Sequence, residues 1–401
     1  MKYTLPRDRQ RVLERCRHRK MARSVQAYVR GSVDRFYEWL ASSRVKRPVG
    51  PHIWICGDCH VGNLGPLAGT AGEVEIGIRD FDQSVIGNPA HDLIRLALSL
   101  ATAARGSDLP GLITAHMMEA IMVGYQMGVE HLGRRRPALG EAGPVRVVLR
   151  EALKRKWRDL AKDRISDPSP EIPLGRCFWP LQAQERAALR ELFASKPVRE
   201  LVTCLRQGKP DDRVEIVDAA YWRKGCSSLG RLRFAVLARV EDQAEEVRHC
   251  LLDIKEASPA VAPHSGRAGM PRNPAKRVIL AARNLSPTLG ERSLAATMCG
   301  RPVFVRELRP QDMKVELGKL HRHEAVATAR YLSEVLGKAH GRQMTAANRQ
   351  RWVRELRRNR SRRLDVPSWL WSTVVELLGI HELAYLEHCR RYALQESVRK
   401  R

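Results

Sequence analysis

Acidic residues are scarce in this 401-residue sequence compared with basic ones. It contains 44 Asp and Glu against 71 Lys and Arg, so its formal net charge is +27. A charge of this size creates a positive potential over much of the surface and favours anionic partners such as nucleotides, nucleic acid or acidic membrane. Net charge alone does not choose among these partners, because arginine-rich runs such as residues 351–363 are typical of solvated helix faces.

Aromatic residues are also scarce, at 5% of the chain. Few aromatic side chains argue against a surface that binds nucleic acid by stacking on its bases. Contacts to a phosphate backbone stay open, through the basic runs at residues 134–136, 154–158 and 351–363. A basic nucleic-acid-binding protein is therefore kept as an alternative from another functional class.

Long apolar runs are absent, since no window approaches the roughly 18 consecutive apolar residues of a membrane-spanning helix. The charged N-terminal segment is followed by no apolar stretch of the kind found in a secretory signal. We therefore expect a cytoplasmic protein without a transmembrane segment. The nine cysteines are odd in number and lack a regular spacing, which predicts free thiols.

The hydrophobic pattern predicts a mixed α+β protein. Helical spacing of apolar residues is found at residues 9–40, 91–104, 113–132, 146–164, 275–285 and beyond 321. Apolar or alternating runs predict strands at Ile53–Cys56, Glu73–Ile78, Val214–Val217, Leu232–Val240, Leu251–Lys255 and Val303–Leu308. Proline-rich stretches predict loops at 165–180 and 258–274. The chain should thus consist of a helical part (1–200), a β-rich part (201–314) and further helices (315–401).

The most informative motif is GDCHVGN, which directly follows the first predicted strand. It places Asp58 and Asn63 five residues apart in a glycine-containing loop. Phosphoryl transfer uses a carboxylate to orient the attacking hydroxyl and an amide oxygen to help hold Mg²⁺, and this spacing matches the kinase catalytic loop. We interpret Asp58 as the catalytic carboxylate and Asn63 as a metal ligand.

Two further carboxylates follow in order. Asp80, in RDFDQ at the end of the second predicted strand, is suited to be the second Mg²⁺ ligand, because Mg²⁺ prefers hard oxygen ligands. Asp92, in GNPAHD, begins an apolar helix and could either cap that helix or support the catalytic loop through its backbone amides. Each carboxylate alone is typical of a cap or a surface residue, and it is the ordered set that predicts a site.

The motifs GDCHVGN, RDFDQS and GNPAHDL resemble the aminoglycoside and choline kinase branch of the protein-kinase-like superfamily. His60, two residues after Asp58, fits that branch. Over nearly its whole length the chain also resembles a bacterial family of uncharacterised proteins, domain of unknown function 2252. That resemblance rests on KMARSVQAYVRGSVDRF, GDCHVGNLG, RDFDQS, LLDIKEA, FVRELRPQDMK and LGKAHGR. Arg30 belongs to the first of these motifs, and a salt bridge to the helical part is as good an explanation for it as a chemical role.

The kinase resemblance implies ATP and Mg²⁺ as cofactors, a phosphate-binding loop and a lysine on a strand. The loop would be Gly225 to Gly230, with Ser227 and Ser228 inside it, and the lysine would be Lys255 in LLDIKEA. Taken alone, GCSSLG is more often a plain hairpin turn. Because both elements follow the catalytic loop instead of preceding it, we expect a circularly permuted, two-lobed kinase-like fold.

One departure weakens the kinase interpretation. The predicted helix after Lys255 carries no glutamate that could pair with the lysine, so a non-catalytic nucleotide-binding protein is a further alternative. The pattern C-x-x-C-H at Cys56–His60 would also fit haem attachment, a redox dithiol or part of a zinc site. We reject these readings, because the export signal, the redox context and the additional ligands are missing from the sequence. The acceptor, and the choice between phosphate and nucleotidyl transfer, are left open.

Overall fold

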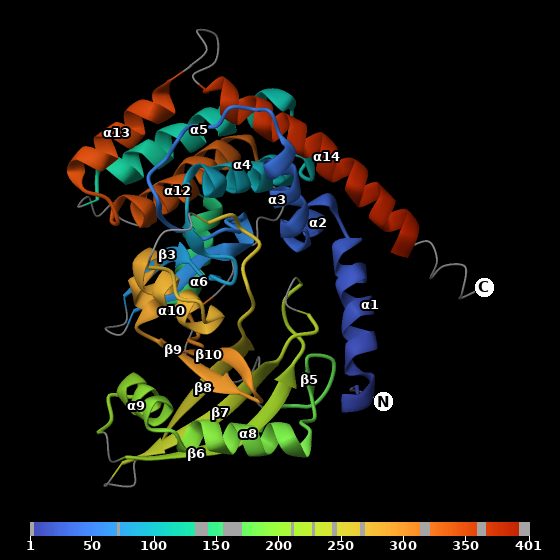
Figure 1. Ribbon diagram of the computed structural model, residues 1–401, viewed down its shortest axis with the longest axis vertical. Helices are drawn as coiled ribbons and strands as arrows, with labels where there is room; N and C mark the ends of the chain where they lie inside the picture. The colour runs from blue at the N-terminus through green and yellow to red at the C-terminus, as the bar shows by residue number, and fades with distance from the viewer. Residues whose placement is uncertain are drawn as a thin grey trace.

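The structure is a computed structural model that describes residues 4–69, 73–132, 143–154, 171–209, 212–226, 229–242, 247–264, 269–312, 321–358 and 366–392. It is a mixed α and β protein, as the hydrophobic pattern predicts. Helices gather at one end and a six-stranded sheet lies at the other (Figure 1). Among the described helices, none combines the length and the apolar character needed to cross a membrane.

The six-stranded sheet is antiparallel throughout, in the order β5-β6-β7-β8-β10-β9. Its strands are β5 (Phe178–Trp179), β6 (Arg213–Trp222), β7 (Arg233–Glu241), β8 (Val247–Glu256), β9 (Ser293–Met298) and β10 (Arg301–Glu307). Helices α8 (Ala183–Ala194) and α9 (Lys196–Leu205) pack on β6 and β9. Helix α10 (Pro274–Leu285), followed by the short α11 (Pro287–Gly290), packs against β9, β10 and the helical end of the molecule.

The helical end is built from segments that are far apart in the sequence. Its elements are α2 (Val25–Gly31), α3 (Val33–Ser42), α4 (Ala90–Arg105), α5 (Gly111–Glu130), α12 (Arg322–Gly341), α13 (Ala346–Arg357) and α14 (Ser368–Tyr392). Helices α5 and α12 approach closely because glycines face each other's backbone. A Cβ on Gly337 would lie 2.2 Å from the Tyr125 carbonyl oxygen, so only glycine permits this crossing.

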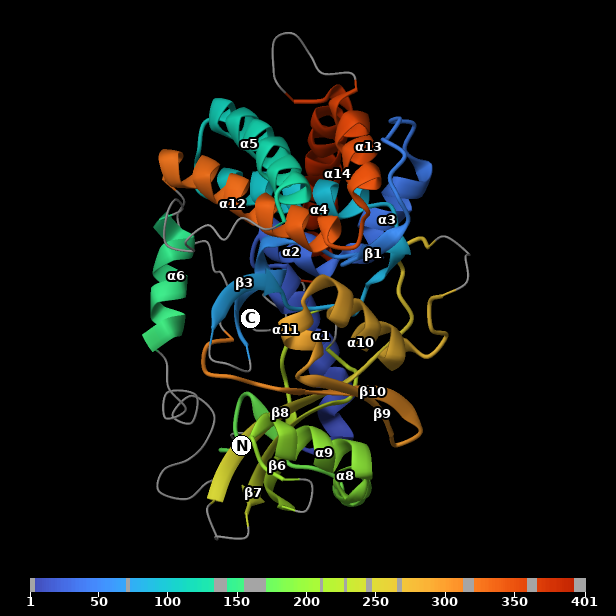
Figure 2. The same cartoon turned by 90° about the vertical axis from the view of Figure 1, so that its left-hand side faces the viewer.

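Two small antiparallel ribbons lie between the helices and the large sheet (Figure 2). Strand β1 (Ile53–Ile55) pairs with β4 (Val85–Gly87), and β2 (Leu64–Ala68) pairs with β3 (Val74–Ile78). Helix α1 (Arg9–Met21) runs from the helical end alongside the sheet in Figure 1, and α6 (Gly143–Lys154) packs against β2, β3 and α12. The ribbons carry the GDCHVGN and RDFDQ motifs at their ends.

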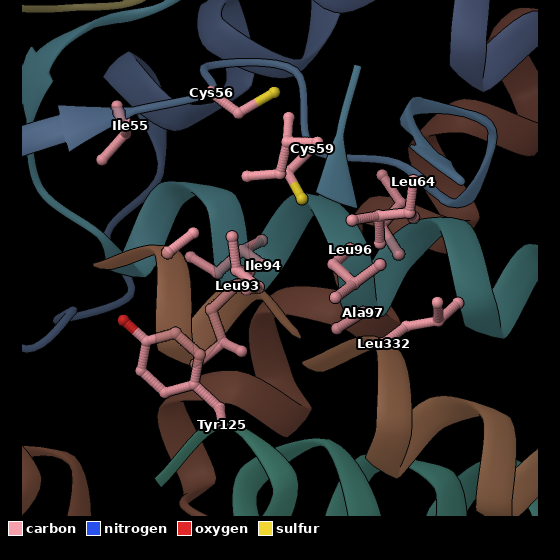
Figure 3. Close-up of a cluster of buried hydrophobic side chains, with 14 of the residues drawn as sticks. Ile55, Cys56, Cys59, Leu64, Leu93, Ile94, Leu96, Ala97, Tyr125 and Leu332 are labelled. Atoms are coloured by element: carbon pink, nitrogen blue, oxygen red, sulfur yellow. The ribbon is translucent and has the colours of Figure 1, made fainter. Parts of the chain in front are cut away.

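Helix α4 forms the core beneath the GDCHVGN loop. Its residues from Ala90 to Ala104 are almost all fully buried. Figure 3 shows its apolar side chains between residues of the 55–64 segment on one side and Tyr125 and Leu332 on the other. The loop is thus anchored in the largest apolar cluster of the molecule, which restrains its backbone.

Most predicted elements are confirmed, but some boundaries are wrong. The stretch at residues 9–40 is three helices and not one, because Ser24 begins a new helix by accepting a hydrogen bond from the Ala27 amide. Strands β2, β4, β5 and β9 were missed, since each is short and lacks a clear alternation. Of the predicted helix at 146–164, residues 155–164 lie outside the described part of the chain. All nine cysteines are free thiols.

Candidate functional site

The loop at residues 56–63 follows β1 and turns sharply at Gly57. This glycine has φ +75, and a Cβ on it would lie 2.0 Å from the carbonyl oxygen of Gln83. Only glycine tolerates both conditions. The turn therefore brings the start of the loop into direct contact with the segment at residues 80–84, which contains the RDFDQ motif.

Asp92 holds the backbone of this loop. Its two carboxylate oxygens accept hydrogen bonds from the amides of Cys56 at 2.6 Å and Gly57 at 2.8 Å. His340 Nε2, from α12, lies 3.2 Å from the same carboxylate. Asp92 is completely buried in the first turn of α4 but is not its N-cap, which is Pro89. Of the two roles considered from the sequence, the geometry is that of a backbone support.

The contacts of Asp92 continue into the helices. His340 Nδ1 lies 2.9 Å from the Tyr125 hydroxyl, which in turn accepts a hydrogen bond from the indole nitrogen of Trp352 at 3.1 Å. All three side chains are buried. The chain of contacts links α5, α12 and α13 to the loop, so segments more than 200 residues away in sequence help to fix its position.

Asp58 is nearly buried and points into a cavity. Its Oδ1 accepts a hydrogen bond from Arg95 Nε at 2.8 Å, while its Oδ2 lies 3.9 Å from His60 Nε2. Burial raises the pKa of the Asp58 carboxyl, and the Arg95 charge opposes that rise only in part. Asn63 donates its side-chain amide to the Asp58 carbonyl at 2.8 Å, which leaves the amide oxygen of Asn63 as its acceptor atom.

The ribbon of β2 and β3 brings Asp80 beside Asn63. Leu64 pairs with Ile78, and the Arg79 amide donates to the Asn63 carbonyl at 2.8 Å. The end of the GDCHVGN motif and the start of the RDFDQ motif are therefore neighbours. Burial alone would raise the pKa of the Asp80 carboxyl, but the charges of Lys255 and Arg306 hold it well below its ordinary range. The two cations therefore favour the charged form of the Asp80 carboxyl.

Lys255 reaches from β8 to the same two motifs. Its ammonium nitrogen lies 3.4 Å from both carboxylate oxygens of Asp80 and 2.5 Å from Asp82 Oδ2. The lysine is almost fully buried. The partner that the sequence did not reveal is thus Asp82, which lies in the RDFDQ motif itself and not in the helix after Lys255.

That helix, α10, supports the RDFDQ segment in another way. Arg277 donates to the carbonyls of Asp82 and Ser258, each at 2.8 Å, and also to the carbonyl of Ser84. The guanidinium is buried and spans three backbone acceptors. An arginine on α10 therefore fixes the backbone at Asp82, while the carboxylate of Asp82 fixes Lys255.

The strands behind Lys255 carry a second buried charge cluster. Asp253 accepts two hydrogen bonds from Arg233 on β7, at 2.9 and 2.6 Å, and two from Arg306 on β10, at 3.2 and 2.8 Å. Burial alone would raise the pKa of Asp253, but these two guanidinium groups hold it far below its ordinary range. Arg306 also donates to the Arg79 carbonyl at 2.9 Å, which ties the sheet to the RDFDQ motif.

One cavity of about 470 Å³, which we call the basic cavity, is lined by Asp58, Asn63, Asp80 and Arg306, among others. Lys255 is not among its described lining residues and contacts it through Asp80. Among its described lining residues are eight Lys and Arg side chains but only two carboxylates, those of Asp58 and Asp80. Other cavities are slightly larger, about 510 to 570 Å³, but none of them is lined by a residue of the GDCHVGN or RDFDQ motif. Chemistry, and not size, therefore distinguishes the basic cavity.

The hairpin between β6 and β7 forms part of its wall. Gly225 and Gly230 have φ +96 and +100, values that favour glycine, and Gly225 lines the cavity. Lys20 of α1 donates to the Gly225 carbonyl at 2.7 Å. The predicted loop residues Ser227 and Ser228 lie outside the described residues, so only the flanks of this loop are placed.

Arg30 lies over the GDCHVGN loop. Its guanidinium is so close to Gly62 that a Cβ there would be 2.8 Å from Arg30 Cζ. Within the described part of the chain Arg30 forms no ion pair, so the salt bridge considered from the sequence is not found there. The side chain instead lines the basic cavity beside Asp58, His60 and Asn63.

Sequence reasoning missed several residues of the site. Arg95 lies in the middle of an apolar helix, where a lone arginine three residues after Asp92 was the available signal. Asp82 was visible as the second carboxylate of RDFDQ, and Asp253 lies two positions before Lys255, on the same face of its strand. His340 belongs to LGKAHGR, but nothing local in that motif indicates that it contacts Asp92.

Comparison with known families shows where the chain belongs. Residues 9–391 match the family described as "Uncharacterized protein conserved in bacteria (DUF2252)". The match covers nearly the whole chain, so the protein is a member of this family. Comparisons with curated proteins and with solved structures give no match.

Proposed function

We propose that this protein is an ATP- and Mg²⁺-dependent phosphotransferase of the kinase-like superfamily that acts on a hydroxyl acceptor. One observation carries the proposal. Lys255 lies 3.4 Å from both oxygens of Asp80 although the two residues are 175 positions apart, and Asp80 adjoins the loop that holds Asp58 and Asn63. An Asp/Asn loop and a carboxylate at one basic cavity, with a lysine paired to that carboxylate, are the groups that kinase chemistry uses.

The order of elements in the sheet supports the same proposal. A glycine-containing hairpin (β6–β7) is followed by the strand with Lys255 (β8) and then by a helix (α10). Kinases arrange the loop over the phosphates, the lysine strand and the next helix in this order. In our proposal the sheet and the helices are two lobes of a circularly permuted kinase-like fold, with Lys255 and the backbone amides of Gly225 and Gly230 facing the ATP phosphates.

The residues present fit a magnesium ion bound together with a nucleotide. The ligands would be the carboxylate of Asp80, whose side chain is 42% exposed, and the amide oxygen of Asn63. Among the described residues no three His, Cys, Asp or Glu form a metal-binding group. Mg²⁺ does not require one, since it usually takes one or two protein ligands and completes its shell with phosphates and water. Bound there, it would neutralise charge on the phosphates.

Asp58 would orient the acceptor and take up its proton. Because Arg95 occupies Oδ1, Oδ2 would be the oxygen that receives the proton of the acceptor hydroxyl. In the transfer the acceptor oxygen forms a bond to the γ-phosphorus, the bond from that phosphorus to the bridging oxygen of ADP breaks, and the hydroxyl proton passes to Asp58. A raised pKa makes this carboxylate a better proton acceptor. His60, 3.9 Å away, would support the carboxylate.

A nucleotide-binding protein without transferase activity is the second candidate. It is favoured by the ion pair between Asp58 and Arg95, which occupies one oxygen of the proposed base in a buried position. Such a pair lowers the basicity of a carboxylate. The two candidates share the nucleotide site and differ only in turnover.

The first test is calorimetric binding of ATP with and without Mg²⁺, using the natural protein, Asp80→Asn and Lys255→Ala. We expect saturable, Mg²⁺-dependent binding that weakens about tenfold or more in each variant, because each loses a charged contact to the phosphates or the metal. Glu38→Gln on the exposed face of α3 serves as the matched control and should bind normally. Absence of binding to the natural protein would sink the proposal and bring nucleic-acid binding forward.

Turnover separates the two candidates. If the natural protein binds Mg-ATP and hydrolyses it slowly in the absence of an acceptor, Asp58→Asn should abolish the hydrolysis and leave the nucleotide affinity within about twofold. Binding without any hydrolysis or transfer, in the natural protein and in the variant alike, would support the non-catalytic candidate.

A further inference from the structure

The N-terminal helices contribute an unusual set of side chains to the basic cavity. Lys20 comes from α1, Arg23 from the turn after it, and Ala27 and Arg30 from α2. Arg30 lies against Gly62, beside Asp58 and His60, while Lys20 contacts the hairpin at Gly225. Figure 1 shows α2 at the helical end and α1 running from it alongside the sheet.

Arg23 and Arg30 differ from the two sheet arginines of the cavity in their pairing. Arg233 and Arg306 share the carboxylate of Asp253, with four hydrogen bonds to it. Arg23 and Arg30 pair with no carboxylate among the residues that the structure describes. Their charge is therefore available to a ligand, whereas the charge of the sheet arginines is largely committed to the fold.

The position of Arg30 assigns this charge to the acceptor and not to the nucleotide. Arg30 lies against Gly62, within the loop between Asp58 and Asn63. The proposed nucleotide-binding groups, Lys255 and Asp80, are instead tied to the strand side of the cavity. A cation beside the carboxylate that receives the acceptor hydroxyl will attract an acceptor that is itself negatively charged.

We propose that the acceptor is a small hydroxyl compound that carries a phosphate group, bound through Arg30 and Arg23 with Lys20 closing the site. The inference rests on the proposed phosphotransferase function. Arginine suits this ligand because its guanidinium makes paired hydrogen bonds to phosphate oxygens. A volume of about 470 Å³ fits a small molecule. Cationic acceptors such as choline or an aminoglycoside would be repelled by the same three cations.

Lys20 connects the N-terminal helix to the hairpin at the edge of the site. It donates to the Gly225 carbonyl at 2.7 Å and so connects α1 to the hairpin between β6 and β7. Burial lowers the pKa of the Lys20 ammonium, because the side chain lies between α1 and the hairpin. Arg223 and Lys224 of the same hairpin also line the cavity, so a phosphate held by Arg30 would face positive charge on two sides.

The test is calorimetry on the full chain loaded with Mg²⁺ and the non-hydrolysable analogue AMP-PNP. Glycerol 1-phosphate is the probe, and glycerol and choline are its neutral and cationic counterparts. We expect only the phosphate ester to bind, and to bind more weakly as salt is added. Inorganic phosphate, titrated separately, shows whether the phosphate group alone is sufficient. Glycerol or choline binding as tightly as glycerol 1-phosphate would overturn the inference.

The variants locate the binding. Arg30→Gln should weaken glycerol 1-phosphate about tenfold or more, because a charged hydrogen bond is lost, while the affinity for Mg-AMP-PNP stays within about twofold. Gly62→Ala should have a similar effect without removing a charge, because its new methyl group would displace the Arg30 guanidinium. Arg35→Gln, an exposed arginine on α3, is the control that should change neither affinity.

The outcomes also separate this inference from the proposed function. Equal weakening of glycerol 1-phosphate and nucleotide in Arg30→Gln would assign Arg30 to the nucleotide and overturn the acceptor site. If the natural protein binds no Mg-nucleotide, the proposed function fails. Phosphate ester binding to the nucleotide-free protein that is lost in Arg30→Gln would still support the basic subsite, and its absence would overturn the subsite as well.

Discussion

The two walls of the basic cavity are held in place by different forces. On one wall, the loop at residues 56–63 is fixed through its backbone, by Asp92 at the amides of Cys56 and Gly57 and by Tyr37 at the carbonyl of Gly57. On the other wall, the strands present side chains that are fixed by one another's charge, as in the cluster of Asp253 with its two arginines. The first wall is anchored to helices, and the second is held together by ion pairs between side chains.

This difference matters for what a ligand can change. Backbone hydrogen bonds to a buried carboxylate restrain the loop that carries Asp58. The pair of Lys255 and Asp82 is a contact between two side chains, and a phosphate can compete for the same lysine. The loop wall therefore supplies fixed geometry, and the strand wall supplies charge that a ligand can redistribute.

The largest effect should come from removing the charge at the centre of the strand wall. Asp253→Asn leaves Arg233 and Arg306 without their common carboxylate in a buried position. We expect the free energy of unfolding to fall by about 3–5 kcal/mol, the usual result of breaking a buried ion pair from one side. Urea unfolding followed by circular dichroism measures it.

The control for Asp253→Asn is Glu215→Gln, which breaks the surface pair with Arg239 on the same sheet. It should lower the free energy of unfolding far less. The pH dependence gives a second readout. Because the folded pKa of Asp253 lies below the ordinary value of 3.8, its stabilising effect is full above 3.8 and is lost as the pH falls from there through the lower folded pKa. Asp253→Asn should flatten the acid loss of stability. If the variant lost stability at low pH in the same way as the natural protein, Asp253 would not be the source of that loss.

A smaller effect is expected from the loop wall. Asp92→Asn keeps one acceptor oxygen but places an amide nitrogen against the second backbone amide, so one buried donor is left unpaired. The cost should be about 1–3 kcal/mol in the free energy of unfolding. Any turnover should fall by more than the nucleotide affinity, because the carboxylate of Asp58 would lose its position.

The exposed Asp34→Asn on α3 is the matched control for this carboxylate-to-amide change. Hydrogen exchange at the Cys56 and Gly57 amides provides a local measurement, since both should exchange faster in Asp92→Asn. Unchanged protection of these amides would contradict the support that we assign to Asp92.

The smallest effect should come from the pair that a ligand can replace. Asp82→Asn removes a negative charge that competes with phosphate for Lys255. We expect Mg-ATP to bind roughly threefold more tightly by calorimetry. A loss of affinity as large as that of Lys255→Ala would instead mean that Asp82 is required to position the lysine, and that the strand wall is as rigid as the loop wall.

Local sequence patterns predicted much of the fold. Strand β1, helices α4 and α10, and the strands β7, β8 and β10 were found from their apolar runs or from the spacing of their apolar residues. The four missed strands are short: β4 and β5 pair with strands far away in the sequence, whereas β2 and β9 form hairpins with β3 and β10. The end of α1 was missed because the cap at Ser24 interrupts an otherwise helical pattern.

The candidate site also has a part that local sequence predicted and a part that it did not. The motifs identified Asp58, Asn63, Asp80 and Asp92, because these residues follow strand ends or begin a helix in a recognisable order. Pairings between distant segments could not be predicted. Nothing in the sequence around Lys255 indicates Asp82, 173 positions earlier, as its partner, and the salt bridge considered for Arg30 gave way to a position over Gly62.

By itself the sequence showed which residues have side chains suited to chemistry, and it placed the chain in one bacterial family. It also determined the positive net charge that favours anionic ligands. Only the tertiary structure decided which of these residues meet. Periodicity reports a residue's own helix or strand, so it is local information. Contacts such as those of His340 with Asp92, or of Lys20 with Gly225, depend on how separate elements pack, and their free energy comes from burying the groups together.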